Sequence, residues 1–389
     1  MLGEYTLFWL YKESLNWILS IELTYLNLLF IWTVLIVTII VIRFSQLYIR
    51  HSTKTWTFII WVFLFVLSIL ILLIRKSWWV LFLGWEGLGL TRFWLVAFYT
   101  RWVAHNGRIL TFLTNRLGDT CLIVVSLYWL RDLIFQQQIK FNLCLWLLLF
   151  TGLWTKRAQY PFIRWLPAAI SAPTPVSALV HSSTLVTAGL YLLIKFNWVK
   201  IFTARARWWL GTLTLIVGSW AALLDLDLKK VVAFSTLRQL GLIFLLFSSK
   251  RLCVIIYHII THAFFKRSLF ICVGVIITIS YSTQSAHLYS SFNINSLTHF
   301  SWFVLTLINL TALPYIRGFY SKENRMSQTL SFITGSITVL LFILLSLTFL
   351  YRWRILIRLS LKDTKNIILR TPYIMNYSAS LINIFFYYL

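Results

Sequence analysis

Long apolar segments recur along the chain, and they constrain its fold more than any other feature of the sequence. A helix that crosses the hydrocarbon core of a bilayer needs about 20 apolar residues. Segments of about this length, joined by short polar connections, fill most of the 389 residues. We predict about eleven spans, at 22–42, 57–74, 77–99, 109–130, 141–155, 176–198, 208–224, 231–248, 252–279, 299–316 and 331–351. The sequence therefore predicts an all-α, polytopic transmembrane helix bundle with no soluble domain.

Composition agrees with a membrane protein and argues against a nucleic-acid-binding protein. Only 12% of the residues are charged, whereas a soluble domain carries about 25%. The formal net charge of +25 would suggest nucleic-acid binding in a soluble protein. Here the basic residues lie between apolar segments and form no stripe, so we predict no nucleic-acid partner. We expect the exposed basic residues to contact lipid headgroups, including anionic, cardiolipin-like lipids.

We predict a single transmembrane domain over 1–351 and a separate tail over 352–389. In the tail, basic residues alternate with isoleucine and leucine, which is typical of a helix lying at the membrane interface. The four cysteines lie inside apolar segments without metal-ligand spacing, so we expect buried thiols and no metal site. Because the first ten residues include Glu4 and lack an arginine-rich, acid-poor character, we expect no cleavable presequence. The basic loop residues do not decide the membrane orientation.

Four of the six prolines lie close together, at Pro161, Pro167, Pro173 and Pro175. Each proline removes a backbone donor and disfavours helix in the residue before it. One interpretation is a helix broken at membrane depth, as found at transporter sites. The other is an ordinary proline-rich surface loop. The pattern alone leaves both interpretations open.

Ionisable side chains within apolar segments are costly, so each one is a candidate for function. Glu86 has no charged neighbour in its segment, and we predict a proton carrier there; the alternative is a link between two helices. Lys156 lies just before the prolines, and a carboxylate partner would make its proton switchable. From the sequence alone, a lysine snorkelling from a helix end is favoured at this position. His181 is either a proton relay or, more simply, a hydrogen-bonding residue between helices.

His258, His262 and Lys266 are spaced by four residues, so a helix presents all three on one face, about 6 Å apart along its axis. We predict a titratable ladder that acts as a proton wire. Metal binding by the two histidines is an alternative, although no carboxylate accompanies them in the sequence. Lys322 and Glu323 are adjacent further along the chain, where they could end the wire or form a solvated pair in a loop.

Two further groups of charged residues have structural interpretations. Asp227, Lys229 and Lys230 are expected at a helix boundary, where they would contact headgroups or the dipole of the following helix. Arg116 and Asp119 are three residues apart and could pair on one face of a helix. We therefore expect a structural role for this pair unless another partner approaches.

Several motifs occur together in a characteristic order. They are LGWEGLGL at 83–90, NRLGD at 115–119, WLPAA at 165–169, APTPVSALVHSST at 172–184, DLKK at 227–230, AFST at 233–236, THAFFK at 261–266 and GFYSK at 318–322. With these motifs, the chain resembles the antiporter-like subunits of proton-pumping NADH:ubiquinone oxidoreductase (respiratory complex I), subunit 5 in particular. The resemblance covers about residues 25–325 and implies an antiporter-like fold.

The resemblance implies a role for each matched residue in a proton relay. Glu86 would be the glutamate of the pump, and Lys156 would be its partner on a helix broken near 141–175. His181 would receive the proton from Lys156. The proline-rich stretch and Lys156 are thereby expected to be functional.

The second half of the relay is implied in the same way. His258, His262 and Lys266 would lie on a second broken helix near 252–279 and form the central wire. Lys322 would then be the exit residue.

The resemblance also implies the setting of the subunit. It would couple quinone reduction elsewhere in the complex to proton pumping, as a non-redox subunit without a cofactor and without direct NADH or quinone binding. Its partners would be other membrane-arm subunits, especially the adjacent antiporter-like subunit. We expect the mitochondrial inner membrane and an organelle-encoded chain, with a bacterial plasma membrane as the alternative. Two alternative functions are the large subunit of a multisubunit cation/proton antiporter and a non-pumping structural subunit.

The sequence departs from the family pattern in two respects. About two N-terminal helices and the C-terminal lateral helix have no counterpart, so we expect a fold truncated at both ends. Arg92, Arg157 and Arg238 stand where the family usually has serine. Either these arginines are paired or snorkelling, or the organellar gene was translated with an unsuitable genetic code.

Overall fold

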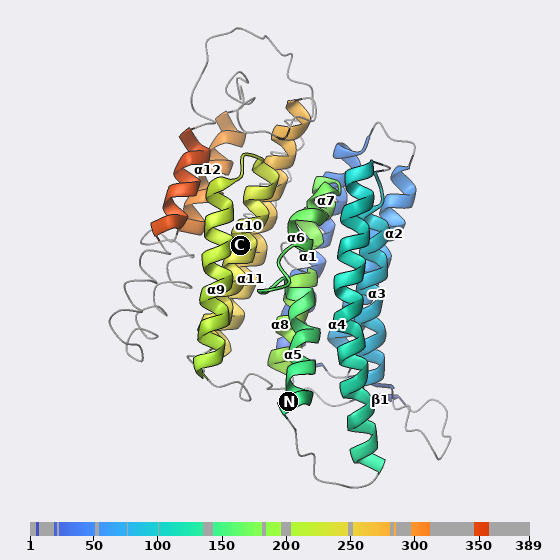
Figure 1. The fold of residues 1–389 in the computed structure, drawn as a ribbon. Helices are drawn as coiled ribbons and strands as arrows, with labels where there is room; N and C mark the ends of the chain where they lie inside the picture. Colours follow the sequence, from blue (N-terminus) through green and yellow to red (C-terminus); the bar gives the residue numbers. More distant parts are fainter. Residues whose placement is uncertain are drawn as a thin grey trace. The chain divides into compact units, whose positions relative to one another are not determined.

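The computed structural model describes residues 5–7, 19–21, 23–50, 54–75, 77–99, 101–134, 143–180, 184–195, 204–247, 252–280, 284, 297–311 and 346–357. Nearly all of these residues are helical (Figure 1). The fold class predicted from the apolar segments is therefore confirmed.

The chain divides into two compact units, where the sequence predicted a single domain over 1–351. One unit comprises 1–39, 53–173 and 184–192, and the other comprises 40–52, 174–183 and 193–389. The division falls within two of the helices, α1 (Tyr25–Tyr48) and α8 (Leu185–Lys195), so both helices contribute to both units.

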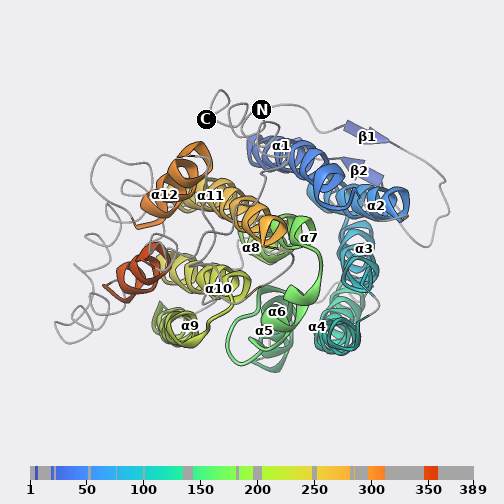
Figure 2. The same cartoon turned by 90° about the horizontal axis from the view of Figure 1, so that it is seen from above.

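The first unit is built mainly from α2 (Thr55–Ile74), α3 (Trp78–Val96), α4 (Trp102–Ile134), α5 (Leu143–Arg157), α6 (Trp165–Ala168) and the short 3-10 helix η1 (Ala169–Ser171). Consecutive helices from α2 to α5 pack side by side, and α6 packs on α4 (Figure 2). The second unit contains α7 (Thr174–Leu179), α9 (Ala204–Leu224), α10 (Leu228–Leu246), α11 (Leu252–Ile279), α12 (Leu297–Thr311) and a further helical segment over 346–357. In this unit α10 packs between α9 and α11.

Helix α2 shows why this fold belongs in a membrane. The helix is apolar except for two threonines and one serine, and its buried residues recur every three or four positions, so they share one face. The buried residues include Phe58, Val62, Phe65, Ile69 and Leu72, whereas Trp56, Ile60, Phe63 and Leu67 are exposed. An exposed face on which nearly every residue is apolar suits lipid. Four described helices, Tyr25–Tyr48, Thr55–Ile74, Trp102–Tyr128 and Leu252–Thr278, are long and apolar enough to cross a membrane.

The proline-rich stretch is a buried break in the helices and not a surface loop. Helix α5 ends at Arg157, and Ala158 follows in a left-handed conformation with φ 53°. The chain then forms only short helical pieces up to Leu179. Most residues over 165–180 are buried, so the broken helix predicted near 141–175 is confirmed.

The second predicted break, near 252–279, is wrong. Helix α11 runs without interruption over 28 residues. The physical reason is its composition: it contains no proline, and its single glycine is Gly274. Every residue of the helix can therefore donate a backbone hydrogen bond.

Two strands lie among the described N-terminal residues, and the sequence did not predict them. β1 (Tyr5–Leu7) pairs antiparallel with β2 (Leu19–Ile21), and Ile21 also forms a bridge with Arg75 between α2 and α3. Each strand has three residues, which is too short to give a recognisable alternation of polar and apolar residues.

The prediction that residues 352–389 form an interfacial tail is wrong for the first of these residues. Residues 346–357 form one helix, and Arg352 within it is 1% exposed. Arg354 donates hydrogen bonds to backbone carbonyls at the end of α9, those of Ala222, Leu223 and Asp225. These carbonyls lack partners within their own helix, so an arginine stabilises this end. The remainder, 358–389, lies outside the described residues.

Candidate functional site

Helices α4 and α5 approach each other at a pair of glycines, which brings Asp119 next to Lys156. A Cβ atom at Gly118 would overlap Oγ1 of Thr155 and would lie 3.0 Å from the carbonyl oxygen of Gly152. Asp119 follows Gly118 directly, and Lys156 lies about one helical turn after Gly152. The missing side chains therefore permit a helix separation at which the two charged groups meet.

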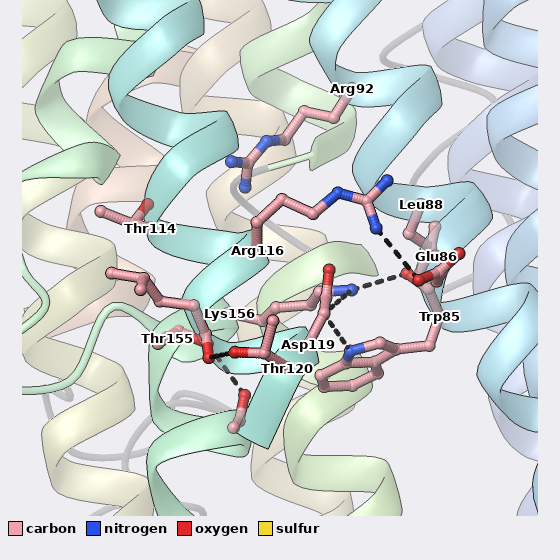
Figure 3. Close-up of polar contacts among 12 residues, drawn as sticks. Trp85, Glu86, Leu88, Arg92, Thr114, Arg116, Asp119, Thr120, Thr155 and Lys156 are labelled. Atoms are coloured by element: carbon pink, nitrogen blue, oxygen red, sulfur yellow. Dashed lines mark hydrogen bonds and ion pairs between the residues drawn. The ribbon is translucent and has the colours of Figure 1, made fainter. Parts of the chain in front are cut away.

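Lys156 is fully buried at the end of α5, and its ammonium group has three partners (Figure 3). Its Nζ lies 3.3 Å from Oδ1 of Asp119 and donates to the carbonyl oxygen of Trp85 at 2.6 Å. Nζ also lies 4.1 Å from the centroid of the Trp85 ring, in cation–π geometry. A charge removed from water needs such partners. The prediction that Lys156 snorkels from the end of its helix is therefore wrong.

Trp85 organises this site, and sequence reasoning missed it. Besides its contacts with Lys156, its indole Nε1 donates to Oδ1 of Asp119 at 2.8 Å. Trp85 is 1% exposed and Asp119 is 3% exposed. The available signal was a tryptophan directly beside the intramembrane Glu86. Consecutive residues of a helix point about 100° apart. Trp85 and Glu86 therefore point in different directions, and Trp85 is the one that faces Lys156 on α5.

Glu86 pairs with Arg116, and not with Lys156 as the resemblance implied. Oε1 of Glu86 accepts a hydrogen bond from Nη1 of Arg116 at 3.0 Å, and the two side chains are 30% and 34% exposed (Figure 3). The predicted pair between Arg116 and Asp119 is also wrong, because each finds a partner on another helix. Glu86 still acts electrostatically on Lys156. The site therefore contains two ion pairs, one buried and one partly exposed.

Two arginines lie in the interior of the same unit. Arg92 donates through Nη2 to the carbonyl oxygen of Thr111 at 3.0 Å, and its guanidinium carbon lies 4.4 Å from the centroid of the Trp165 ring. Arg157 is 0% exposed, and its Cγ lies 2.7 Å from where a Cβ atom at Gly189 would be. Because Arg92 is 1% exposed, neither side chain snorkels to water.

In the second unit, α11 carries the predicted ladder. His258, His262 and Lys266 are 6%, 3% and 0% exposed, whereas Tyr257 on another face is 42% exposed. The prediction that the three titratable residues share one buried face is therefore confirmed. The ring centroids of the two histidines lie 6.3 Å apart. Nζ of Lys266 donates to Oγ of Ser235 on α10, a partner that sequence reasoning did not assign.

Further cations surround Lys266. The charges of Arg238 on α10 and Arg352 on the 346–357 segment both act on it. Nε of Arg352 donates to the hydroxyl oxygen of Tyr351 at 3.1 Å. Arg238 is fully buried, so it does not snorkel either.

The start of α10 agrees only in part with its prediction. Asp227 occupies the N-cap position, and its Oδ2 lies 2.8 Å from Nζ of Lys230. This confirms the predicted helix boundary. Lys230 precedes the apolar segment 231–248, and its hydrogen bond to Asp227 raises its pKa. Lys229 is 2% exposed, so the expected contact with headgroups is wrong for this residue.

Three predicted residues, His181, Lys322 and Glu323, lie outside the described residues. Among the residues that the structure describes, no group of three or more His, Cys, Asp or Glu side chains is placed to hold a metal ion. The described titratable groups include one buried lysine beside a carboxylate, another beside a hydroxyl, and two buried imidazoles on α11.

Comparison with known proteins gives consistent matches. Residues 76–350 match the family described as the transmembrane part of NADH:quinone oxidoreductase/Mrp antiporters. NADH-ubiquinone oxidoreductase chain 5 of Anopheles quadrimaculatus is 35% identical over 364 residues, covering 89% of this chain and 62% of that protein. The protein of the same name from Anopheles arabiensis is 36% identical over 327 residues, covering 80% and 84%. The chain thus spans less than two thirds of the length of several relatives.

Solved structures share the fold. A chain of the Mrp complex from Dietzia sp. superposes with a TM-score of 0.81 at 24% identity, covering 98% of this chain and 44% of that one. A chain of the membrane-bound sulfane sulfur reductase, an archaeal respiratory membrane complex, superposes with a TM-score of 0.78 at 17% identity, covering 95% and 80%. The antiporter-like fold implied by the sequence motifs is confirmed.

Proposed function

Because the chain belongs to the NADH:quinone oxidoreductase/Mrp antiporter transmembrane family, we propose that it translocates protons as a membrane-arm subunit of NADH:ubiquinone oxidoreductase. The relatives named chain 5 of that enzyme support this choice. In this proposal the multi-pass subunit lies in the mitochondrial inner membrane beside another antiporter-like subunit. It holds no redox cofactor and binds neither NADH nor quinone.

The buried pair of Lys156 and Asp119 is the observation that carries the proposal. A buried ion pair adds little net stability, because desolvation of the two charges offsets their attraction. Ion pairs of this kind in a membrane protein interior mark ion and proton pathways. The pair lies where the helix is broken, which is where transporter sites form.

We propose that an exchange of partners drives the proton step. Arg116 and Asp119 lie three residues apart on α4, so Arg116 can turn from Glu86 to Asp119 without movement of the helix. Lys156 would then lose its carboxylate partner, and an ammonium in an apolar site without a counter-ion readily releases its proton. Protonation of Glu86 would free Arg116 and so start the exchange. Trp85 would hold the lysine amine in place during this step.

The released proton would pass to the ladder of His258, His262 and Lys266. Imidazole both accepts and donates protons, which suits the interior of a wire. Ser235 would hold the amine of Lys266 in place through their hydrogen bond. In this proposal His181 is the link of the relay and Lys322 is its exit.

Affinity purification from native membranes tests the assignment to the oxidoreductase. The chain is expected to co-purify with an assembly that oxidises NADH, and vesicles containing the assembly should acidify one compartment during NADH oxidation. An assembly that exchanges cations for protons and does not oxidise NADH would contradict the proposal.

That second outcome describes the alternative function, an antiporter subunit. It is supported by the matching family, whose description includes Mrp antiporters. Cation-dependent proton movement in vesicles without NADH would establish it.

A further inference from the structure

Trp85 contacts both members of the buried ion pair, and it does so through three different groups. Its indole Nε1 donates a hydrogen bond to Oδ1 of Asp119 at 2.8 Å. Its backbone carbonyl oxygen accepts a hydrogen bond from Nζ of Lys156 at 2.6 Å, and its ring centroid lies 4.1 Å from the same Nζ. All three residues are at most 3% exposed. Trp85 therefore acts on the carboxylate and on the ammonium group by separate contacts.

The indole and the ammonium group meet at a single oxygen atom. Oδ1 of Asp119 accepts the indole hydrogen bond and also lies 3.3 Å from Nζ of Lys156 (Figure 3). A carboxylate oxygen has two lone pairs and can accept from two donors at once. The indole N–H of Trp85 therefore shares the carboxylate oxygen to which the lysine could pass its proton.

A buried ion pair of this kind can neutralise itself. An N–H bond of the Lys156 ammonium would break and an O–H bond would form on Asp119, which leaves a neutral amine and a neutral carboxyl group. An apolar interior favours this transfer, because the burial of two charges is costly. A proton that passed to Asp119 would not reach the relay, so this transfer would compete with pumping.

We propose that Trp85 is a positioning residue that opposes this transfer and thereby directs the proton of Lys156 to the relay. This role of Trp85 rests on the proposed pumping function. A hydrogen bond to an ionised carboxylate is roughly twice as strong as one between neutral groups. Protonation of Asp119 would therefore weaken the indole hydrogen bond, whereas loss of the lysine proton to the relay leaves that bond intact.

The indole hydrogen bond also fits the proposed exchange of partners. Arg116 would replace Lys156 beside Asp119, and the carboxylate would have to stay in place for the lysine to return to it. Trp85 lies on α3 and Asp119 on α4, so the indole ties the carboxylate to the neighbouring helix. Both cations would then meet the carboxylate at the same position.

Trp85→Phe in the assembled complex tests this role. The substitution removes the indole N–H, but it keeps an aromatic ring and the backbone carbonyl at residue 85. Infrared difference spectra detect a protonated carboxyl group by its C=O stretching band, and the loss of a band after Asp119→Asn assigns that band to Asp119. We expect such a band in Trp85→Phe. The matched control is Trp79→Phe, since Trp79 lies on the same helix and is 38% exposed, and it should show no band.

The ratio of protons pumped to electrons transferred gives the functional readout. Trp85→Phe should lower this ratio while NADH oxidation persists, and Trp79→Phe should leave the ratio unchanged. The absence of the Asp119 band in Trp85→Phe, or an unchanged ratio in that variant, would overturn the role of Trp85.

The unmodified complex gives a second measurement, which needs no variant at residue 85. Its spectrum should contain no carboxyl band that Asp119→Asn removes, because the indole hydrogen bond is in place. Such a band would overturn the role of Trp85 even if Trp85→Phe failed to assemble. An unmodified complex that does not pump would contradict the proposed function itself, which keeps the two failures apart.

Discussion

At the scale of single residues, the two ion pairs of the first unit differ in burial. Lys156 and Asp119 meet inside the protein, whereas Glu86 and Arg116 meet where both are about one third exposed. Removing one partner of a buried pair leaves an uncompensated charge and costs about 3–5 kcal/mol, while an exposed pair is worth about 0–1 kcal/mol. Both pairs include a residue of α4, but the loss of a partner is expected to cost much more stability in the buried pair than in the exposed one.

Asp119→Asn should therefore destabilise the protein far more than Glu86→Gln. The first change leaves Lys156 buried without its carboxylate, at a cost of about 3–5 kcal/mol, and the second costs about 1 kcal/mol or less. The difference can be measured by heating the purified assembly and monitoring the loss of this subunit from it. Equal shifts in the unfolding temperature would show that loss of Asp119 does not leave a costly buried charge at Lys156.

Ser235→Ala should slow proton transfer, because Lys266 loses the hydroxyl that accepts its hydrogen bond. The pumping rate of the assembly should fall severalfold while NADH oxidation by the rest of the complex persists. Ser126→Ala is a matched control, since Ser126 is buried and its hydroxyl bonds only the carbonyl of Ile123 in its own helix. The same pumping rate in both variants would remove Ser235 from the relay.

At the scale of helices, the sequence predicts length and apolarity well and predicts contacts poorly. The predicted spans of α2, α3 and α11 match the structure within a few residues. A run of about 20 apolar residues indicates a membrane-spanning helix, and its ends mark the ends of that helix. Helix α4 begins at Trp102 and not near 109, since its first turns carry exposed polar residues such as His105 that no apolar pattern marks. The break assigned to α11 came from resemblance, and its own residues give no reason for one.

The ion pairs could not be predicted, because they depend on where helices far apart in sequence touch. Lys156 follows Asp119 by 37 positions and contacts it only because α4 and α5 approach at Gly118 and Gly152. A sequence pattern reports the face of one helix, and it contains no information on the neighbouring helix. Asp119 was recognised as a candidate, while its partner was misassigned.

Gly118→Ala tests this close approach. The added methyl group would overlap Thr155 and force α4 away from α5, at about 1–3 kcal/mol, and Lys156 would separate from Asp119. Gly89→Ala is the control, because a Cβ atom there meets nothing within 4 Å and alanine favours a helix over glycine. Thermal unfolding should show a large downward shift for Gly118→Ala and none, or a small gain, for Gly89→Ala. Similar shifts for the two variants would contradict the packing argument.

At the scale of the whole molecule, each unit holds titratable groups in its interior. The first unit holds the pair of Lys156 and Asp119, and the second holds the ladder of His258, His262 and Lys266. A protein that only spaced its neighbours would gain nothing from buried charges, which are costly in a membrane. This distribution supports the proposed proton carrier, in which pumping depends on Lys156.

The ratio of protons pumped to electrons transferred tests this claim most directly. It should be measured in vesicles with the assembled complex carrying Lys156→Ala, next to Lys54→Ala, which changes an exposed lysine before α2. Lys156→Ala should lower the ratio or abolish pumping, and Lys54→Ala should leave the ratio at its natural value. An unchanged ratio in an assembled Lys156→Ala complex would contradict the account.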